Sequence, residues 1–325
     1  MRIILHFSYA YDKMVCKNKK RSVAVLYNNL SSYLKNKYNG KISKICIDGG
    51  FGCPNRDGTC GVGGCIYCGE RGAGEHIDAT VSIREQVEAA LAKDTKSDGL
   101  IAYFQNFTNT YAPLDVLKER YDSALISDRI SVLAIGTRPD CITDEIAELI
   151  ASYKTRVDVW VELGLQTASD EVATVINRGY KTDVYRRATD ILKSHGIPFV
   201  SHMIIGLPTD NEENIDKTVD LINEGAWGVK IHSIYVMEGT TLSDMYRQGG
   251  YVPPSLDEYV RLCAKSISRL RPDVIVHRIT GDCPDGMLVA PEWNKNKNEI
   301  IDLVRKKLAS DGLRQGSCYD TDVLK

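Results

Sequence analysis

The side chains of this sequence that are best suited to chemistry are concentrated in one glycine-rich stretch. It holds four of the ten cysteines, namely Cys53, Cys60, Cys65 and Cys68. Thiolates are the ligands that iron-sulfur clusters and zinc select. Cys65 and Cys68 form a CxxC pair whose sulfurs can face one centre, and Cys53 lies far enough upstream to close over it. Because glycine supplies the positive φ angles that such a loop needs, the stretch predicts a metal-binding loop.

Two other kinds of site are compatible with these cysteines. Structural zinc is bound by four nearby cysteines, although the six residues between Cys53 and Cys60 do not match the spacing of a zinc knuckle. A thioredoxin-like redox pair would use a CxxC motif beside a βα unit, but the long loop and the additional cysteines would then have no role. Spacing alone leaves zinc open as an alternative.

The composition favours a protein of the cytoplasm. A chain of 325 residues, 43% of them hydrophobic, can bury a full core without disulfide bonds, and no export signal is visible. No apolar run reaches the ~18 to 20 residues of a membrane helix, so no membrane is expected as a partner. The 41 basic and 43 acidic residues leave a net charge of -2, which gives no indication of nucleic-acid binding.

Six strand-like runs alternate with stretches of helical periodicity, which is the pattern of repeated βα units around a parallel sheet. The predicted strands are Lys44–Asp48, Leu100–Phe104, Val132–Ile135, Val157–Leu163, Phe199–Ile205 and Val229–Val236. We expect an α/β fold built as a partial (β/α)6 barrel, with a doubly wound sheet as the alternative. Ligands gather at the carboxyl ends of such strands, and the cysteine loop follows the first strand. The loop therefore lies where a catalytic cofactor would bind.

Helix signals fill the intervals between these strands. Ser82 and Thr143 each precede an amphipathic run, and Asp210–Glu213 opens another with a capping residue and early acids. Beyond the sixth strand the pattern predicts a helix over Leu256–Leu270, a strand over Val274–His277 and a helix over Glu299–Leu308. These last elements are expected to flank or close the barrel.

The chain is divided into three parts. Residues 1–26 include the basic run Lys17–Arg21 and show no periodicity, so they are interpreted as a disordered leader. Residues 27–272 form the core, and residues 273–325 form a C-terminal helical and strand extension that packs on it.

Several strings resemble known enzymes. Cys65-Ile-Tyr67-Cys68 is similar to the second half of the radical SAM signature, in which an aromatic residue precedes the last cysteine. The longer gap back to Cys53 resembles the branch related to the elongator catalytic subunit. More narrowly, the chain resembles a bacterial family of stand-alone radical SAM proteins of this size. The matching strings, which run in order between Tyr27 and Leu308, are Asp48–Gly58, Gly63–Cys65, Ala102–Pro113, Ile135–Asp140, Val161–Thr167, Ile205–Pro208 and His277–Asp282.

The resemblance implies a radical SAM barrel in which Cys53, Cys65 and Cys68 ligate a 4Fe-4S cluster and Cys60 is a bystander. The remaining iron binds the methionine amine and carboxylate of S-adenosyl-L-methionine (SAM). One-electron cleavage of SAM then gives a 5'-deoxyadenosyl radical that abstracts a hydrogen atom from the substrate. An electron donor such as flavodoxin or ferredoxin is an implied partner.

The resemblance also implies residues that bind the methionine and adenine parts of SAM. The backbone of Tyr67 meets the adenine, and Gly206 after the fifth strand admits the adenine closely. Gln105 and Asn106, which follow the second strand, bind the methionine amino end.

Three further residues are implied to bind polar groups of SAM. Arg138 after the third strand could pair with a carboxylate, since guanidinium geometry suits that contact. Glu162 and Gln166, around the end of the fourth strand, suit the ribose hydroxyls or the amino group. The alternative for Arg138 and Glu162 is a structural ion pair with each other across the barrel mouth.

His202, Lys230 and His232 are the catalytic candidates. His202 and His232 alternate with apolar neighbours in their strands, and Lys230 points the same way as His232, so the three could line the barrel and meet substrate. A hydrogen-bonded core histidine is the structural alternative.

The elongator-related resemblance implies a role in tRNA wobble-uridine modification, with tRNA as a partner. A radical SAM oxidoreductase acting on a small molecule would share every motif named above and would lack affinity for RNA. A non-catalytic zinc-binding scaffold is a third hypothesis, and it would not cleave SAM.

Overall fold

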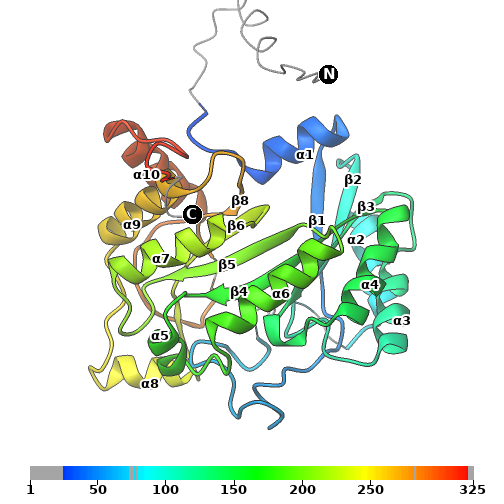
Figure 1. Cartoon of the computed structure of the whole chain (residues 1–325), viewed down its shortest axis with the longest axis horizontal. Helices are drawn as coiled ribbons and strands as arrows, with labels where there is room; N and C mark the ends of the chain where they lie inside the picture. Colours follow the sequence, from blue (N-terminus) through cyan, green and yellow to red (C-terminus); the bar gives the residue numbers. More distant parts are fainter. Residues whose placement is uncertain (1–24, 73–76, 78–79, 282, 321–325) are drawn as a thin grey trace, which may run out of the picture.

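The computed structural model describes residues 25–72, 77, 80–281 and 283–320. Its centre is a curled half-barrel of seven parallel strands, which follow one another in sequence order except that β8 pairs with β6 (Figure 1). The strands of this sheet are β1 (Ile42–Ile47), β2 (Gly99–Phe104), β3 (Ile130–Thr137), β4 (Asp158–Gln166), β5 (Phe199–Ile205), β6 (Gly228–Ser233) and β8 (Ile275–Arg278). A second, antiparallel pair joins β7 (Val236–Met237) to β9 (Leu288–Ala290).

Ten α-helices are described, and most of them cover the outer face of the sheet (Figure 1). They are α1 (Leu30–Tyr38), α2 (Ile83–Lys93), α3 (Leu114–Ala124), α4 (Asp144–Ser152), α5 (Asp170–Val175), α6 (Thr182–Ser194), α7 (Glu212–Asn223), α8 (Thr241–Arg247), α9 (Leu256–Arg269) and α10 (Lys297–Ser310). Short 3₁₀ helices span Pro139–Cys141 and Tyr153–Thr155. Ser82 closes a capping box with Glu85 at the start of α2, and the Thr143 side chain caps α4.

The strands are buried on both faces, as parallel sheets require. All six residues of β2 are buried. The larger apolar core lies between the sheet and the outer helices, whereas a smaller cluster around Leu34, Tyr103 and Trp160 involves side chains that point to the other face. Helix α1 contributes Leu34 to this smaller cluster. The inner side of the half-barrel is therefore filled with apolar side chains near α1 and remains free for polar side chains elsewhere.

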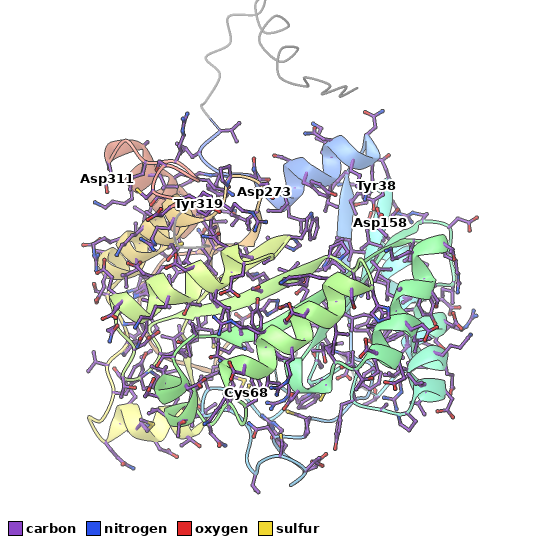
Figure 2. All side chains as sticks on the ribbon, viewed as in Figure 1. Tyr38, Cys68, Asp158, Asp273, Asp311 and Tyr319 are labelled. Atoms are coloured by element: carbon purple, nitrogen blue, oxygen red, sulfur yellow. The ribbon has the colours of Figure 1, made fainter. Side chains whose placement is uncertain are left out.

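Helix α1 is fixed against the amino-terminal ends of the strands. The Tyr38 hydroxyl donates to the Asp158 carboxylate, and Lys37 Nζ lies 2.6 Å from the same carboxylate, which stands at the start of β4. In Figure 2 the Tyr38 and Asp158 labels lie near one end of the sheet, while Cys68 lies near the opposite end. Since α1 closes one end, ligands have access from the end that carries the cysteine loop.

The predicted α/β partial barrel is confirmed, with two differences in detail. The predicted strand over Val274–His277 is not a flanking element, because β8 pairs in parallel with β6 and makes a seventh strand. The predicted sixth strand divides: β6 ends at Ser233, and the residues from Val236 onward leave the sheet to pair with β9.

Two smaller predictions have different outcomes. Helix α7 is capped by the Asn211 side chain, one residue after Asp210, because that side chain accepts the Asn214 N–H. Of the predicted leader over residues 1–26, residues 1–24 lie outside the described residues, so that prediction stays untested. The division at residue 272 also stays a prediction.

Candidate functional site

The cysteine loop leaves the carboxyl end of β1 and is held from its first residue. The Asp48 carboxylate, 6% exposed, accepts the Gly50 N–H at 2.8 Å and the Asn106 Nδ2 group at 2.6 Å. The loop then reaches Cys53, whose carbonyl accepts the Arg56 N–H at 2.8 Å and so forms a turn. These bonds fix the position of Cys53 relative to β1.

Three polar side chains hold the rest of the loop in place. Asn55 Nδ2 donates to the Asn177 carbonyl at 2.6 Å, and Asn177 Nδ2 donates to the Gly64 carbonyl at 2.8 Å, which links the loop to the segment after α5. The Arg56 guanidinium donates to the carbonyls of Gly69 at 2.6 Å and Glu70 at 3.0 Å. Backbone carbonyls on both sides of the CxxC pair are thereby satisfied, and the loop is held in one arrangement.

The two thiols of the CxxC pair interact, and their pKa values shift in opposite directions. A hydrogen bond from Cys68 lowers the pKa of Cys65 to about 6, and Asn55 Nδ2 adds a contact of 3.8 Å to the Cys65 sulfur. The same hydrogen bond raises the pKa of Cys68 well above its usual value, and the nearby Cys53 contributes to that rise. Cys53, Cys65 and Cys68 all line one cavity. The structure thus brings the three predicted ligands to one place.

The three thiols can be compared with the cluster that the resemblance implies. Among the described residues, no three His, Cys, Asp or Glu side chains gather closely enough to hold one metal ion. Cys53, Cys65 and Cys68 nevertheless line one cavity, and thiolates are the ligands that iron-sulfur clusters select. The chemistry of this donor set therefore fits the implied cluster.

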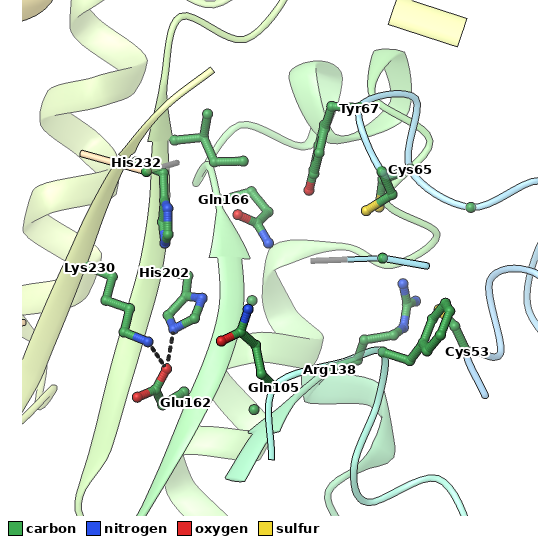
Figure 3. A pocket seen from close by; sticks show the side chains of 18 of the residues that line it. Cys53, Cys65, Tyr67, Gln105, Arg138, Glu162, Gln166, His202, Lys230 and His232 are labelled. Atoms are coloured by element: carbon green, nitrogen blue, oxygen red, sulfur yellow. Dashed lines mark hydrogen bonds and ion pairs between the residues drawn. The ribbon is translucent and has the colours of Figure 1, made fainter. Parts of the chain in front are cut away.

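The cavity has a volume of about 310 Å³ and extends from the cysteine loop toward the interior of the half-barrel. Figure 3 shows Cys53 and Cys65 on one side and Glu162, Lys230, His202 and His232 on the other, with Gln105 and Gln166 between the two groups. The lining side chains include residues of β1 to β6, of β8 and of the cysteine loop. The cavity therefore has two chemically distinct ends, one lined by thiols of the cysteine loop and one lined by polar side chains of the strands.

The end remote from the cysteines is built around Glu162, which is 3% exposed. Lys230 Nζ forms an ion pair with its carboxylate, His202 Nε2 lies 2.8 Å from Oε2, and Trp160 Nε1 donates to Oε1 at 3.2 Å. Although burial opposes ionisation, Lys230 and His202 hold the pKa of Glu162 well below its usual value. Glu162 is therefore a buried, ionised carboxylate.

Burial disfavours the charged form of the basic groups around Glu162 and so lowers their pKa values. It lowers the pKa of Lys230 to about 7, against the attraction of Glu162 and with help from the positive charges of Lys44 and Arg278. It also lowers the pKa of His202 and takes that of His232 well below the usual value. Both histidines are thus neutral at pH 7, which keeps their ring nitrogens available for hydrogen bonds.

Five of the residues predicted to bind SAM line the cavity: Tyr67, Gln105, Arg138, Glu162 and Gln166. Gln166 has φ of +66° at the end of β4, a conformation that is uncommon for a residue with a side chain and that recurs at functional sites. These residues are placed where a ligand beside the cluster could reach them.

The ion pair between Arg138 and Glu162 considered above is not formed. Arg138 makes a two-pronged pair with Asp140, with Nη2 to Oδ2 at 2.6 Å and Nε to Oδ1 at 2.9 Å, while Glu162 pairs with Lys230. Asp140 follows Arg138 by two residues, so the local turn brings their side chains together. Each residue therefore has its own counter-charge.

Two predicted SAM-binding residues are not among those that line the cavity, Asn106 and Gly206. Asn106 is fully buried and bonds to Asp48, at the base of the cysteine loop. Gly206 has φ of +95°, and a Cβ added there would lie 2.6 Å from Pro254 Cδ. Both positions support neighbouring segments, and their direct roles toward SAM stay predictions.

Several residues that line the cavity were not predicted as site residues from the sequence. Lys44 and Tyr103 lie within predicted strands, Arg56 lies within the loop, and Arg278 lies within a matching string. In the sequence, Lys44 and Arg278 stand out as charged residues next to apolar, strand-like residues. A charged residue at such a position does not show whether its side chain lies on the inner or the outer face of the sheet.

Two family models match the chain. The Radical SAM superfamily matches residues 50–222, which is more than half of the sequence and includes the cysteine loop and β2 to β5. The Radical SAM C-terminal domain matches residues 226–310, from β6 through α10.

Relatives and a solved structure agree with these matches. The uncharacterized protein YtqA of Bacillus subtilis (strain 168) is 36% identical over 298 residues, which are 90% of this chain and 92% of that protein. The tRNA uridine(34) acetyltransferase of Methanocaldococcus jannaschii is 31% identical over 178 residues, 53% of this chain and 32% of that protein.

The structure of the archaeal Methanocaldococcus infernus Elp3, with an N-terminal deletion, has a similar fold. Its TM-score is 0.64 at 21% identity, and the match covers 84% of this chain and 64% of that chain. Within the described part of this chain, no helix has the length and apolar character needed to cross a membrane.

Proposed function

Because the chain belongs to the radical SAM superfamily and is a radical SAM enzyme, we propose that Cys53, Cys65 and Cys68 hold a 4Fe-4S cluster and that SAM binds in the adjoining cavity. The observation that carries this proposal is the position of the three thiols at one end of a cavity whose other end is lined by buried polar groups. When bound, the cluster supplies an electron that cleaves SAM to a 5'-deoxyadenosyl radical, which abstracts a hydrogen atom from the substrate.

The chain's own residues orient the two ligands and keep water out. In this proposal Gln105, Gln166 and Arg138 contact the polar groups of SAM, and Tyr67 covers the adenosine part. Asn106 acts through Asp48 on the cysteine loop. An enclosed site protects a reactive radical from solvent, and the half-barrel, closed by α1 at its other end, provides such an enclosure.

The substrate occupies the end of the cavity that is remote from the cysteines. His202, Lys230 and His232 lie there and are the residues proposed to meet it. An external electron donor such as flavodoxin or ferredoxin would reduce the cluster.

We propose tRNA as the substrate, modified at the wobble uridine. The support is the similarity over about half of this chain to a tRNA uridine(34) acetyltransferase, together with the shared fold of Elp3. A cytoplasmic site of action follows from that substrate.

The cluster assignment is tested by two cysteine variants. We expect Cys65→Ala, after anaerobic reconstitution with iron and sulfide, to lose the absorption of the cluster and to form no 5'-deoxyadenosine from SAM with a chemical reductant. Cys60→Ala is the matched control, because Cys60 is in the same loop but is exposed, with its sulfur 3.7 Å from Asp140. Equal loss in both variants would contradict the ligand assignment, and zinc in place of iron would favour the scaffold hypothesis.

The substrate proposal is tested on RNA from cells. Modified nucleosides of tRNA from a deletion strain and its parent are quantified by mass spectrometry, and we expect one wobble-uridine nucleoside to change. Complementation with the wild-type gene should restore it, and the Cys65→Ala gene should not. An unchanged profile in the presence of active, SAM-cleaving enzyme would refute tRNA and favour a small-molecule substrate.

A further inference from the structure

Hydrogen-bonding groups at the end of the cavity remote from the cysteines are unequally divided between donors and acceptors. Glu162 is the carboxylate that lines this cavity among the described residues. Its two oxygens already accept from Lys230, His202 and Trp160. A ligand that brings further donors would find little free acceptor capacity on Glu162.

Donors remain available at the same place. In its protonated form Lys230 has three N–H groups, and its bonds to Glu162 and to the Tyr103 hydroxyl at 3.2 Å use two of them. His232 Nε2 is buried and has no hydrogen-bond partner among the described residues. Figure 3 shows the His232 ring directed into the cavity beside His202. A buried polar atom of this kind indicates a partner that a ligand supplies.

Positive charge reaches this region from both edges of the open sheet. Lys44 on β1 and Lys230 on β6 place their ammonium groups 4.9 and 4.4 Å from the centre of the Tyr103 ring. Arg278 on β8 lies opposite Lys230 in the strand register and also lines the cavity. β1 and β8 are the two edge strands of the half-barrel. Two cations from β1 and β6 therefore lie beside one aromatic ring, and a third, from β8, lines the same cavity.

Lys44 and Lys230 differ in accessibility. Lys230 is 5% exposed and held by Glu162, whereas Lys44 is exposed and its described contact is with the Tyr103 ring. The positive charge of Lys44 is close enough to Lys230 to contribute to the lowering of its pKa, and such repulsion between like charges is relieved when an opposite charge joins them. An anion placed between Lys44, Lys230 and His232 would relieve that repulsion and use the free donors.

We propose that Lys44, Lys230 and His232 form an anion subsite, in which an anionic oxygen group of the substrate binds at the end of the cavity remote from the cysteine loop. This inference rests on the proposed function, since it takes that end of the cavity as the substrate position. The group is a carboxylate carried by the target base or a phosphate next to the target nucleoside. Lys230 is held by Glu162 and Tyr103, so it positions the group, while Lys44 selects for its charge.

The test measures binding to the reconstituted enzyme with SAM, by anaerobic isothermal titration calorimetry. The probes are 5-carboxymethyluridine, its methyl ester, uridine 3'-monophosphate and uridine. We expect at least one charged probe to bind roughly tenfold or more tightly than its neutral counterpart. Preference for the carboxylate identifies the base substituent as the source of the anion, and preference for the monophosphate identifies the RNA backbone.

Lys44→Met is the decisive variant because Lys44 is exposed, so its removal leaves no buried charge unpaired. We expect it to reduce the preference for the charged probe to less than about threefold, and Lys44→Arg to restore most of it. Lys41→Met is the matched control, since Lys41 is an exposed lysine just before β1 that does not line the cavity. It should keep the wild-type preference.

Equal affinity for charged and neutral probes in the wild-type enzyme, or an unchanged preference in Lys44→Met, would overturn the anion subsite. Both results are measured as binding affinities, so they do not depend on catalytic turnover. Failure of the proposed function would be recognised separately, by the absence of 5'-deoxyadenosine or by an unchanged tRNA nucleoside profile. The two ideas can therefore fail independently.

Discussion

At the scale of single residues, the site depends on polar side chains that are each held by a specific partner. Asn55 and Arg56 satisfy the backbone of the cysteine loop, and Asn106 holds Asp48 at its base. Lys230 holds Glu162 in the interior. A buried charge is tolerated only where its partner is present, so each of these pairs must be assembled together for the site to form.

The Glu162–Lys230 pair gives a prediction at this scale. Lys230→Met leaves an ionised carboxylate buried with two neutral donors, and we expect it to lower the free energy of unfolding by about 3–5 kcal/mol. The double variant Glu162→Gln with Lys230→Met should cost much less than the sum of the single changes, because no unpaired charge remains. Urea unfolding of the four proteins measures this coupling. If the losses of stability in the two single variants simply add in the double variant, the interaction between Glu162 and Lys230 contributes nothing to stability.

At the scale of elements, α7 and α9 are joined by a ladder of opposite charges. Glu212, Asp216 and Asp220 recur every four residues on α7, and Arg261, Lys265 and Arg269 do so on α9. Lys265 Nζ lies 2.6 Å from Glu212 and 2.8 Å from Asp216, which ties two turns of one helix to one lysine of the other. The four-residue spacing keeps all of these side chains on facing sides of the helices.

Glu212 provides the pH prediction. Its hydrogen bonds to Arg261 and Lys265 lower its pKa from 4.5 to about 2, so the folded chain binds this proton less readily than the unfolded chain. The stabilisation is therefore complete above pH 4.5 and is lost as pH falls from 4.5 toward 2. Since Glu212 is 40% exposed, we expect Glu212→Gln to cost no more than about 1 kcal/mol at pH 7.

The measurement is the difference in urea midpoint between wild type and Glu212→Gln at pH 7 and at pH 3.5. Glu213→Gln is the matched control, because Glu213 is more exposed and pairs with Lys217 in its own helix. The difference in urea midpoint between wild type and Glu213→Gln should be smaller than that for Glu212→Gln. A Glu212→Gln difference that grows on acidification would contradict the expected direction of the pH dependence.

At the scale of the whole molecule, the two ends of the described chain meet beside β8. Gln315 accepts the Asn28 N–H at 2.8 Å and donates to the carbonyls of Arg271 at 2.8 Å and Val274 at 2.7 Å. The Val276 N–H then donates to the Asn28 carbonyl at 2.7 Å. A residue after α10 thus links the segment before α1 to the edge strand that carries Arg278.

We expect Gln315→Ala to lower the free energy of unfolding by about 1–3 kcal/mol, because three backbone groups lose their partners at once. Thermal unfolding followed by circular dichroism measures the loss. Gln248→Ala is the control, since Gln248 is exposed at the end of α8, and it should change stability by less than about 0.5 kcal/mol. Equal effects would mean that the junction beside β8 contributes no stability.

The sequence by itself determined the features that depend on near neighbours along the chain. Alternation of β-branched and helical segments located the strands from β1 to β6, and Ser82 and Thr143 marked the starts of α2 and α4. The type and order of the cysteines indicated a metal loop, because thiolate chemistry and glycine conformation are properties of those residues themselves. These patterns survive folding since tertiary contacts reinforce them.

Only the tertiary structure decided which distant side chains become partners. Glu162 and Lys230 meet because β4, β5 and β6 pair in a register that brings the two side chains to one place, and no local pattern encodes that register. The same reason applies to β8, which pairs with β6 as the seventh strand, and to Asn106, which donates a hydrogen bond to Asp48. The residue types of the cysteine loop indicated its chemistry directly, whereas the charged end of the cavity exists only because the curled sheet brings Lys44, Lys230 and Arg278 to one cavity.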